Sequence, residues 1–276
     1  MPGTLILVGT PIGNLSDFSP RAIEALRSCD CIAAEDTRVS LTLLNHFGIR
    51  KPLISYFEHN KQERGAVICR KLEEGETVAL VTDAGMPAIS DPGEDLVALC
   101  HERGIPVTVI PGPSAAVAAL AVSGLPSGRF TFEGFLSVNR RERLARLDSL
   151  KDEQRTMIFY EAPHKLVGTL DDLYAAFGER RVCLARELTK LHEEILRTTL
   201  SAAQERYHET PPRGEFVLIV EGALPAETTP DTPEQAAALA RMFIQEGLSA
   251  SNAAKKAAAE TGVKKGDIYR LLIQEE

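Results

Sequence analysis

The sequence predicts an α/β protein with two α/β domains and a small, all-α, helix-turn-helix-like C-terminal domain. Strand and helix patterns alternate along residues 1–122, which is typical of an open α/β domain. A break rich in Gly, Pro and Ser, "SGLPSGR", then opens a second α/β domain at residues 123–222. A polar linker at residues 223–233 leads to residues 234–276, where only helical patterns occur. The length of 276 residues favours two main domains, since a domain usually holds roughly 100–200 residues.

In the first domain, short apolar runs alternate with amphipathic stretches. Runs such as "TVALVT" are apolar at almost every position, which fits parallel strands covered on both faces. We expect strands at residues 4–8, 31–34, 52–56, 77–82 and 106–110, and helices at 20–27, 41–47, 62–73 and 94–102.

The second domain repeats this alternation. Its clearest helix, residues 164–177, carries an apolar stripe that predicts a core-facing side. We expect strands at residues 130–135, 156–160, 182–186, 195–200 and 216–221, with another helix at 140–150.

The C-terminal region predicts three helices, at residues 234–246, 250–260 and 265–274. Ser249 or Ser251 is a candidate N-cap for the second helix, and Gly262 is a candidate for its end. Two small helices joined by a short turn have helix-turn-helix geometry.

Composition narrows the class of protein. The net charge of −8 argues against a surface that is basic all over, although it allows local basic patches. The five cysteines are odd in number and irregularly spaced, so we expect buried, reduced thiols in a cytoplasmic protein and no metal site. The N-terminal apolar run is too short for a signal peptide, and no run approaches the ~18 apolar residues of a membrane span.

Loops rich in Gly and Pro follow three of the expected strands: "GTPIGN" (9–14), "DAGMPAISDPG" (83–93) and "PGPSA" (111–115). The carboxyl ends of parallel strands are where open α/β sheets bind ligands. Neither a G-x-x-x-x-G-K-[ST] nor a G-x-G-x-x-G motif is present, so these loops predict a ligand of modest charge held mainly by backbone groups. The alternative is that they are ordinary turns.

Polar stretches end other expected strands: "AEDTR" (34–38), "SYFEHN" (55–60) and "FYEAPHK" (159–165). Acids at such positions serve either chemistry or the capping of the next helix. For Asp36, which precedes a helix, the two interpretations have equal weight.

Seven motifs in this order, "VGTPIGNL", "AAEDTR", "EHN", "TDAGMPAISDPG", "IPGPSA", "FYEAPHKL" and "ARELTK", closely resemble one family. It is the bacterial ribosomal RNA small subunit methyltransferase I family, a tetrapyrrole-methylase-like (class III) family of S-adenosylmethionine-dependent enzymes. The resemblance covers residues 4–222 and, more loosely, the helical tail.

The resemblance implies 2′-O-methylation of a cytidine in small-subunit (16S) ribosomal RNA, either as RNA or within the assembled small subunit. It implies two α/β domains of tetrapyrrole-methylase type with S-adenosyl-L-methionine in the interdomain cleft, and commonly a homodimer. Met86 departs from the family, which usually has Thr there. The cofactor-binding positions that the resemblance implies are Pro11, Ala84, Gly85, Met86, Ile89, Ser114, Ala115, Glu161 and Ala162.

Methyl transfer to a hydroxyl requires that the acceptor lose a proton, so we expect a base near the reacting oxygen. The candidates are Glu35, Asp36 and His59, and Arg38 is a candidate for holding a phosphate or orienting an acid.

Two basic clusters are candidates for contacts with RNA phosphates, with solvated helix faces as the alternative. One is at the start of the helix at 140–150, and the other flanks the turn of the helical tail. Their residues are Arg140, Arg141 and Arg143, and Lys255, Lys256, Lys264, Lys265 and Arg270. Rival interpretations of the whole chain are a small-molecule methylase with a tetrapyrrole-like substrate and a non-enzymatic RNA-binding protein, but the basic tail argues against the first and the intact Gly/Pro loops against the second.

Overall fold

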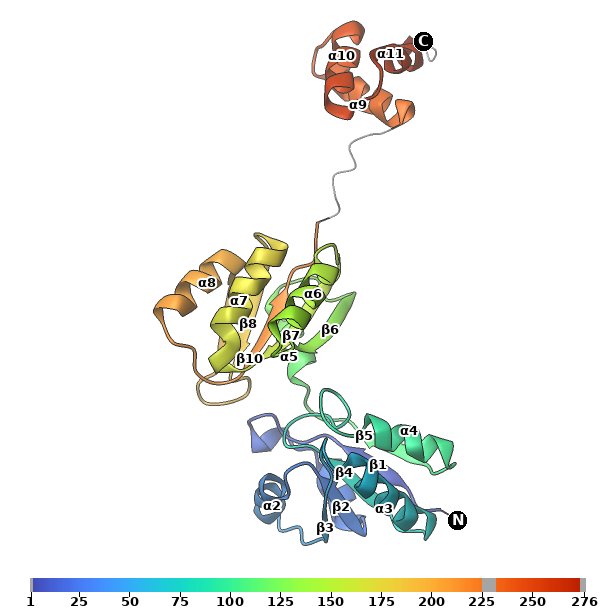
Figure 1. The fold of residues 1–276 in the computed structure, drawn as a ribbon, viewed down its shortest axis with the longest axis vertical. Helices are drawn as coiled ribbons and strands as arrows, with labels where there is room; N and C mark the ends of the chain where they lie inside the picture. Colours follow the sequence, from blue (N-terminus) through green and yellow to red (C-terminus); the bar gives the residue numbers. More distant parts are fainter. Residues whose placement is uncertain (1, 225–231, 274–276) are drawn as a thin grey trace. The chain divides into compact units, whose positions relative to one another are not determined.

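The structure is a computed structural model that describes residues 2–224 and 232–273. The chain divides into two compact units, Met1–Ala223 and Leu224–Glu276, and each is described by itself (Figure 1). The first unit holds two five-stranded sheets, and the second unit is helical.

The first sheet is wholly parallel and has the strand order β3-β2-β4-β1-β5. In this order the carboxyl ends of β1 and β4, which the two longest Gly/Pro loops follow, are neighbours. The strands are β1 (Leu5–Val8), β2 (Cys31–Ala34), β3 (Leu53–Ser55), β4 (Val78–Val81) and β5 (Val107–Ile110).

Helices cover both faces of this sheet, as the uniformly apolar strands predict. On one face α3 and α4 enclose Leu5 and Leu80, and on the other α1 and α2 enclose Val8 and Ile32. The helices are α1 (Pro20–Ser28), α2 (Thr37–His46), α3 (Lys61–Glu73) and α4 (Glu94–Glu102), with a short 3-10 helix, η1 (Leu15–Asp17).

The second sheet is mixed and has the order β6-β7-β10-β8-β9. Only β6 and β7 pair in parallel, and a register shift at Phe132/Gly134 bends β6. The strands are β6 (Phe130–Phe135), β7 (Thr156–Glu161), β8 (Arg181–Arg186), β9 (Glu194–Thr199) and β10 (Phe216–Val220).

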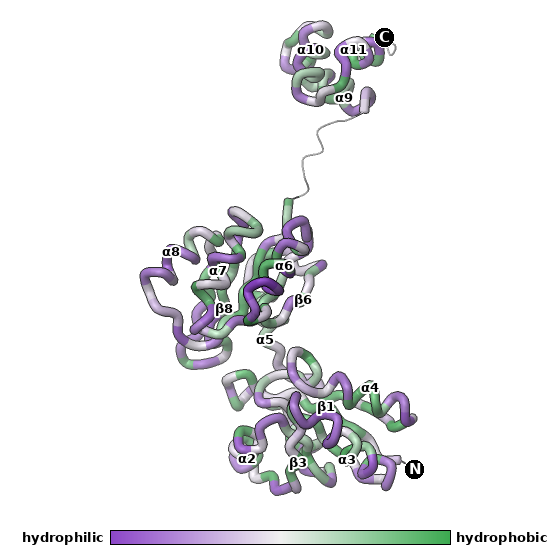
Figure 2. The backbone as a smooth tube through the Cα atoms, in the orientation of Figure 1, coloured by the Kyte–Doolittle hydropathy of each residue, from purple (hydrophilic) through white to green (hydrophobic). Residues whose placement is uncertain are grey.

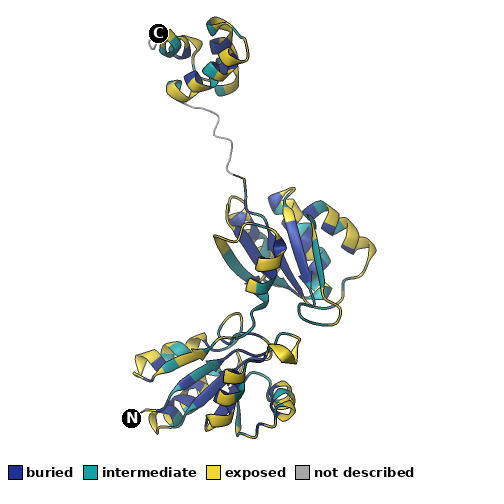
Figure 3. Ribbon diagram, turned by 180° about the vertical axis from the view of Figure 1, so that it is seen from behind, coloured by how far each residue is buried: buried dark blue, intermediate teal, exposed yellow. Residues whose placement is uncertain are grey.

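One face of this sheet packs against α6 (Arg140–Leu150), α7 (Pro163–Phe177) and α8 (Leu200–Glu209). The predicted stripe of α7 is buried there, except for Tyr174, which is exposed. Figures 2 and 3 show the apolar, buried strands between helices whose outer faces are polar and exposed.

The other face is covered by α5 (Ala115–Ser123), a helix that the sequence analysis did not predict. Its Ala116, Ala119 and Leu120 pack against the second sheet. This packing favours a domain boundary before Ala115 rather than at residues 123–129, because α5 completes the core of the second sheet. The helix α8 was not predicted either, because its polar composition masks its buried side.

The helical unit is formed by α9 (Pro233–Gln245), α10 (Ala250–Thr261) and α11 (Lys265–Ile273), as predicted. Small side chains such as Ala240 and Ala257 let the helices approach closely around Ile268. Ser249 occupies the N-cap position of α10 but its side chain makes no capping hydrogen bond, and Gly262 ends this helix with φ 74°. Most of the predicted linker, residues 225–231, lies outside the described residues.

All five cysteines are buried and none is paired in a disulfide, so their predicted burial is confirmed. Burial raises the pKa of Cys31 to about 11 and that of Cys100 to about 12, so these thiols stay protonated. Within the described residues, no helix is both long and apolar enough to cross a membrane.

Candidate cofactor cavity and active site

The three Gly/Pro loops of the first sheet contact one another at its carboxyl edge, as their positions predict. Thr10 and Gly85 exchange backbone hydrogen bonds, with N to O distances of 2.8 and 3.2 Å. The backbone N–H of Gly112 points at the sulfur of Met86, 3.2 Å away. The loops at 9–14, 83–93 and 111–115 therefore form one continuous wall.

Gly9 and Gly112 are needed for this contact, because their backbones touch. A Cβ atom added at Gly9 would lie 2.7 Å from Cα and 2.8 Å from N of Gly112, distances at which the backbone would have to move. Glycine is therefore the residue that lets the first and third loops meet.

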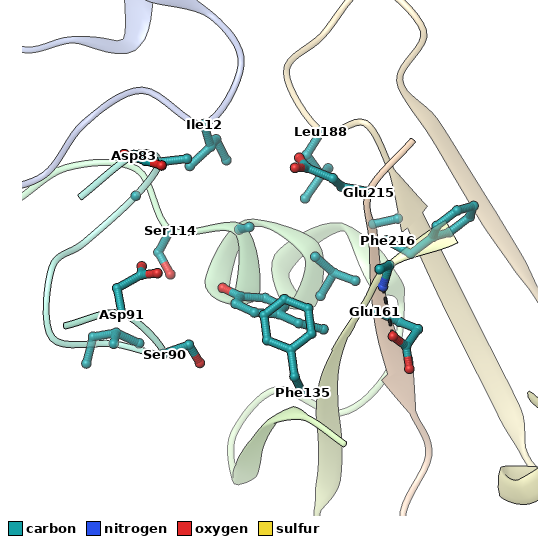
Figure 4. Close-up of a pocket in the computed structure, with 18 of the residues that line it drawn as sticks. Ile12, Asp83, Ser90, Asp91, Ser114, Phe135, Glu161, Leu188, Glu215 and Phe216 are labelled. Atoms are coloured by element: carbon teal, nitrogen blue, oxygen red, sulfur yellow. Dashed lines mark hydrogen bonds between the residues drawn. The ribbon is translucent and has the colours of Figure 1, made fainter. Parts of the chain in front are cut away.

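The wall borders a cavity of about 440 Å³, whose opposite side is formed by the second sheet (Figure 4). Its volume falls within the range of small-ligand sites, roughly 300–1,000 Å³. Side chains from the loop at 83–93 and from α5 line it, together with Phe135, Tyr160 and Leu188 of the second domain.

Most of the predicted cofactor-binding residues line this cavity. Pro11 does not, although its neighbour Ile12 does. The predicted residues that line it are Ala84, Gly85, Met86, Ile89, Ser114, Ala115, Glu161 and Ala162.

Glu35 is the one predicted catalytic candidate that lines the cavity. Its Oε2 accepts a hydrogen bond of 2.7 Å from the hydroxyl of Thr82. The two residues follow Ala34 and Val81, which are paired in register in β2 and β4, so the sheet itself places them side by side.

Asp36 and Arg38 do not line the cavity. The carboxylate of Asp36 accepts from the backbone N–H of Arg38 at 2.9 Å and caps α2, and it also accepts from the guanidinium at 3.0 and 2.6 Å. The hydrogen bonds from Arg38 lower the pKa of Asp36 to about 2, which makes it a weak base. This geometry favours the helix-cap interpretation of Asp36.

His59 also lies outside the cavity lining, and its side chain is exposed. Its ring is 6.2 Å from that of Phe57, edge to face. The strand that precedes it, β3, is at the edge of the sheet, whereas Glu35 follows a strand inside the sheet.

Asp83 and Asp91 were missed as candidates, although both belong to the quoted loop at 83–93. Desolvation, followed by the charge of Glu35, raises the pKa of Asp91 to about 6. Desolvation also raises the pKa of Asp83, whose carboxylate accepts from the backbone N–H of Asp36 at 3.1 Å. The sequence could have indicated them as candidates, because both lie in a Gly/Pro-rich loop that follows a predicted strand.

The carboxylate of Glu161 serves the second domain itself. It accepts from the hydroxyl of Thr169 at 2.6 Å and from the backbone N–H of Ala162 at 2.8 Å, at the start of α7. Figure 4 shows it turned away from Asp91 and Ser114. Glu161 therefore lines the cavity, while its carboxylate is hydrogen-bonded within the second domain.

Tyr160 and Lys190 are also held in place. The Tyr160 oxygen accepts from the backbone N–H of Ala116 at 3.1 Å, at the start of α5. Lys190 lies 2.8 Å from a carboxylate oxygen of Glu187 and 2.9 Å from one of Glu215. The positive charge of Lys190 is therefore matched by its own neighbours.

Backbone strain is concentrated around the cavity. Among the described residues, four non-glycine residues have positive φ: Ala88 (68°), Ser90 (62°), Glu187 (51°) and Thr189 (66°). All four lie in the loop at 83–93 or in the "ARELTK" segment, which supply residues of the two sides of the cavity. Such strain is typical of sites where the chain is shaped for a ligand.

The charge of the cavity is predominantly negative. Glu35, Asp83, Asp91 and Glu215 line it together with Glu161, against the single ammonium group of Lys190. This arrangement favours a ligand that carries positive charge.

The predicted RNA-binding arginines differ in how free they are. Arg140 and Arg141 are exposed at the start of α6. Arg143 is largely buried instead, and it donates to Asp172 at 2.7 Å and to the carbonyl of Ser137 at 3.1 Å. Its role in stabilising the fold argues against phosphate binding by this side chain.

The predicted basic residues of the tail, Lys255, Lys256, Lys264, Lys265 and Arg270, are all exposed. Lys256 lies 3.8 Å from the ring centroid of Phe243, and Lys265 donates to the hydroxyl of Ser251 at 3.1 Å. These contacts hold the cations over α9 and α10 while leaving them accessible to solvent.

The fold and the cavity have counterparts among known proteins. The family profile "Tetrapyrrole (Corrin/Porphyrin) Methylases" matches residues 4–204. The methyltransferase CobJ has a TM-score of 0.61 at 20% identity, covering 81% of this chain and 95% of that one. A uroporphyrin-III C-methyltransferase from Thermus thermophilus, complexed with S-adenyl homocysteine, has a TM-score of 0.55 at 18% identity, covering 79% of this chain and 97% of that one. These matches define the class: the fold is that of the tetrapyrrole methylases.

Curated relatives narrow the class. "Ribosomal RNA small subunit methyltransferase I" of Synechocystis sp. is 48% identical over 99% of this chain and 99% of that protein. The protein of the same name from Escherichia coli O157:H7 is 44% identical over 99% of this chain and 96% of its own length. The chain therefore belongs to the tetrapyrrole methylase family and, within it, to the ribosomal RNA small subunit methyltransferase I family.

Proposed function

We propose that this chain transfers a methyl group from S-adenosyl-L-methionine to the 2′-oxygen of a cytidine ribose in small-subunit (16S) ribosomal RNA. The observation that carries the proposal is the acid-lined cavity between the two sheets of the first unit. When bound, the cofactor supplies an electrophilic methyl group on a sulfonium cation.

The residues of the cavity fit this cofactor. Glu35, Asp83 and Asp91 offer negative charge to the sulfonium and ammonium groups. Gly85 and Ala115 belong to the backbone-rich loops, whose N–H and C=O groups suit the amino-acid end and the adenine edge. Ile89 and Phe135 add apolar surface for the rest of the molecule.

Glu35 is the proposed acceptor of the proton of the 2′-hydroxyl. Thr82 holds its Oε2, and no described residue is hydrogen-bonded to Oε1, so this oxygen has a lone pair to offer. A base held beside the reacting oxygen typically contributes 10²–10⁴-fold to the rate. Alignment of the hydroxyl with the methyl group contributes several kcal/mol more.

The proposed substrate is RNA presented by the small ribosomal subunit, which sets the expected location in the bacterial cytoplasm. We propose that Arg140 and Arg141, at the start of α6, and the exposed lysines of the helical unit contact phosphates. We also propose that the chain works as a homodimer, as the family resemblance implies.

The test is methyl transfer from cofactor labelled in its methyl group to small ribosomal subunits that lack the modification. The expected result is one labelled ribose 2′-oxygen, at a cytidine of the 16S RNA. Label on a base, or equal labelling of subunits that already carry the modification, would contradict the proposal.

A further inference from the structure

A second cavity, of about 280 Å³, lies in the second domain. Three arginines, Arg186, Arg206 and Arg213, line it together with Glu194, Tyr207 and Pro212. None of these residues lines the cofactor cavity, and none is a predicted site residue.

The two cavities are nevertheless linked through β8. Arg186 is the last residue of this strand, and its neighbour Ala185 lines the cofactor cavity. Successive side chains of a strand point to opposite faces, so the end of β8 contributes to both cavities from its two faces. Arg206 and Tyr207 reach the second cavity from α8.

The second cavity has an excess of positive charge. Glu194 is its only carboxylate, and its two oxygens lie 3.1 Å from Nε of Arg186 and 2.5 Å from Nη2 of Arg206. Arg213 is exposed and has no carboxylate partner among the described residues. The lining of this cavity therefore carries three guanidinium groups and one carboxylate, and this excess of positive charge favours binding of an anion.

The segment that carries Arg213 is held in place. Pro211 and Pro212 restrict its backbone, and Nη1 of Arg186 donates to the carbonyl of Arg213 at 3.5 Å. Gly214 has φ 81°, and a Cβ atom there would lie 2.4 Å from Cγ of Glu187. Arg213 is thus displayed at the cavity by a fixed turn.

We propose that Arg186, Arg206 and Arg213 form a binding site for a backbone phosphate of the substrate RNA. Guanidinium groups match phosphate oxygens with paired N–H donors, which suits a site that fixes the position of the strand. The phosphate belongs to the strand whose ribose enters the cofactor cavity, so the inference rests on the proposed function.

The test compares binding of unmodified small ribosomal subunits by the full-length protein and by Arg213→Ala at several salt concentrations. We expect Arg213→Ala to weaken binding about 5–10-fold and to reduce the slope of log K against log[salt] by about 1. Arg213→Lys, which keeps the charge but loses the paired donors, should lie between the two. The affinity for S-adenosylmethionine should stay unchanged, which also shows that the variants fold.

The matched control is Arg64→Ala in α3, which removes another exposed arginine that has no carboxylate partner among the described residues. If Arg213→Ala binds subunits as Arg64→Ala does, with the same salt slope, the phosphate site is refuted while the proposed function stands. If the unaltered protein neither binds nor methylates the subunits, the proposed function fails, and the phosphate site fails with it.

Discussion

Glu35 and Asp36 are neighbours in the chain, yet their environments differ completely. Glu35 lines the cavity and is bonded to Thr82, whereas Asp36 is paired with Arg38 and caps α2. The motif "AEDTR" points to this strand end, but only the strand register reveals which carboxylate belongs to the cavity. The motif is therefore enough to locate the loop, but the structure is needed to tell which of its residues lines the cavity.

Glu35→Gln tests the proposed proton acceptor. The amide keeps the size of the side chain and removes its basicity, so we expect turnover at saturating cofactor to fall at least about 100-fold. The affinity for S-adenosylmethionine, measured by calorimetry, should change less than about threefold.

His59→Ala is the comparison variant, because this exposed histidine lies outside the cavity lining. We expect it to keep turnover within about threefold. Full activity of Glu35→Gln, or loss of activity in His59→Ala alone, would show that a group other than Glu35 accepts the proton.

Asp91 makes stability depend on pH. Its folded-state pKa of about 6 lies above the value of an unfolded Asp, near 3.9. The folded protein therefore binds more protons between these values, and the stability that the protonated form contributes is lost as the pH rises through about 6.

Asp91→Asn, which resembles the protonated acid, should therefore raise the melting temperature at pH 8. The expected gain is about 2–4 °C, on the order of 1 kcal/mol once solvent screening of this partly exposed group is allowed for. At pH 4, close to the pKa of the unfolded Asp, most of the gain should vanish in thermal denaturation. A gain of equal size at both pH values would mean that the carboxylate is not desolvated. No sequence pattern could have predicted this pKa, since it depends on burial and on the charge of Glu35.

At the scale of elements, the three Gly/Pro loops and most helices were predicted, whereas the helices α5 and α8 were missed. Gly and Pro at strand ends predict the loops that border the cavity, because few other residues permit such backbone contacts. By contrast, α5 was missed because an apolar helix such as "AAVAALAVS" has no amphipathic pattern, and its partner is a sheet formed by later residues.

Gly9→Ala tests whether contact between the loops builds the cavity. A methyl group at this position would meet the backbone of Gly112 at 2.7 Å, so the loops must separate. We expect cofactor affinity to fall at least tenfold and the melting temperature to drop by several degrees.

Gly128→Ala provides the control for this variant, because a Cβ atom there would meet nothing within 4 Å. It should leave both quantities unchanged. If Gly9→Ala binds the cofactor as tightly as Gly128→Ala does, the cavity does not depend on this contact.

At the scale of the whole molecule, the sequence predicted the two α/β domains and the helical unit from changes in pattern and composition. The sequence did not show where the chain passes from the first sheet to the second, because this point depends on which sheet α5 covers.

Removal of residues 224–276, the helical unit, should leave cofactor binding intact, because every residue that lines the cofactor cavity belongs to the first unit. We expect the affinity for small ribosomal subunits to fall about tenfold, because the exposed lysines of α10 and α11 are lost. Calorimetry with the cofactor and a subunit-binding assay measure the two effects separately. Equal subunit affinity with and without the unit would remove it from RNA binding.

The central claim is that S-adenosylmethionine occupies the cavity between the two sheets of the first unit. A crystal structure with S-adenosylhomocysteine, the product of methyl transfer, tests it most directly. We predict that the product lies against Gly85 and Ala115 with its sulfur on the side of Glu35. Ordered density for the product anywhere else on the chain would contradict the account.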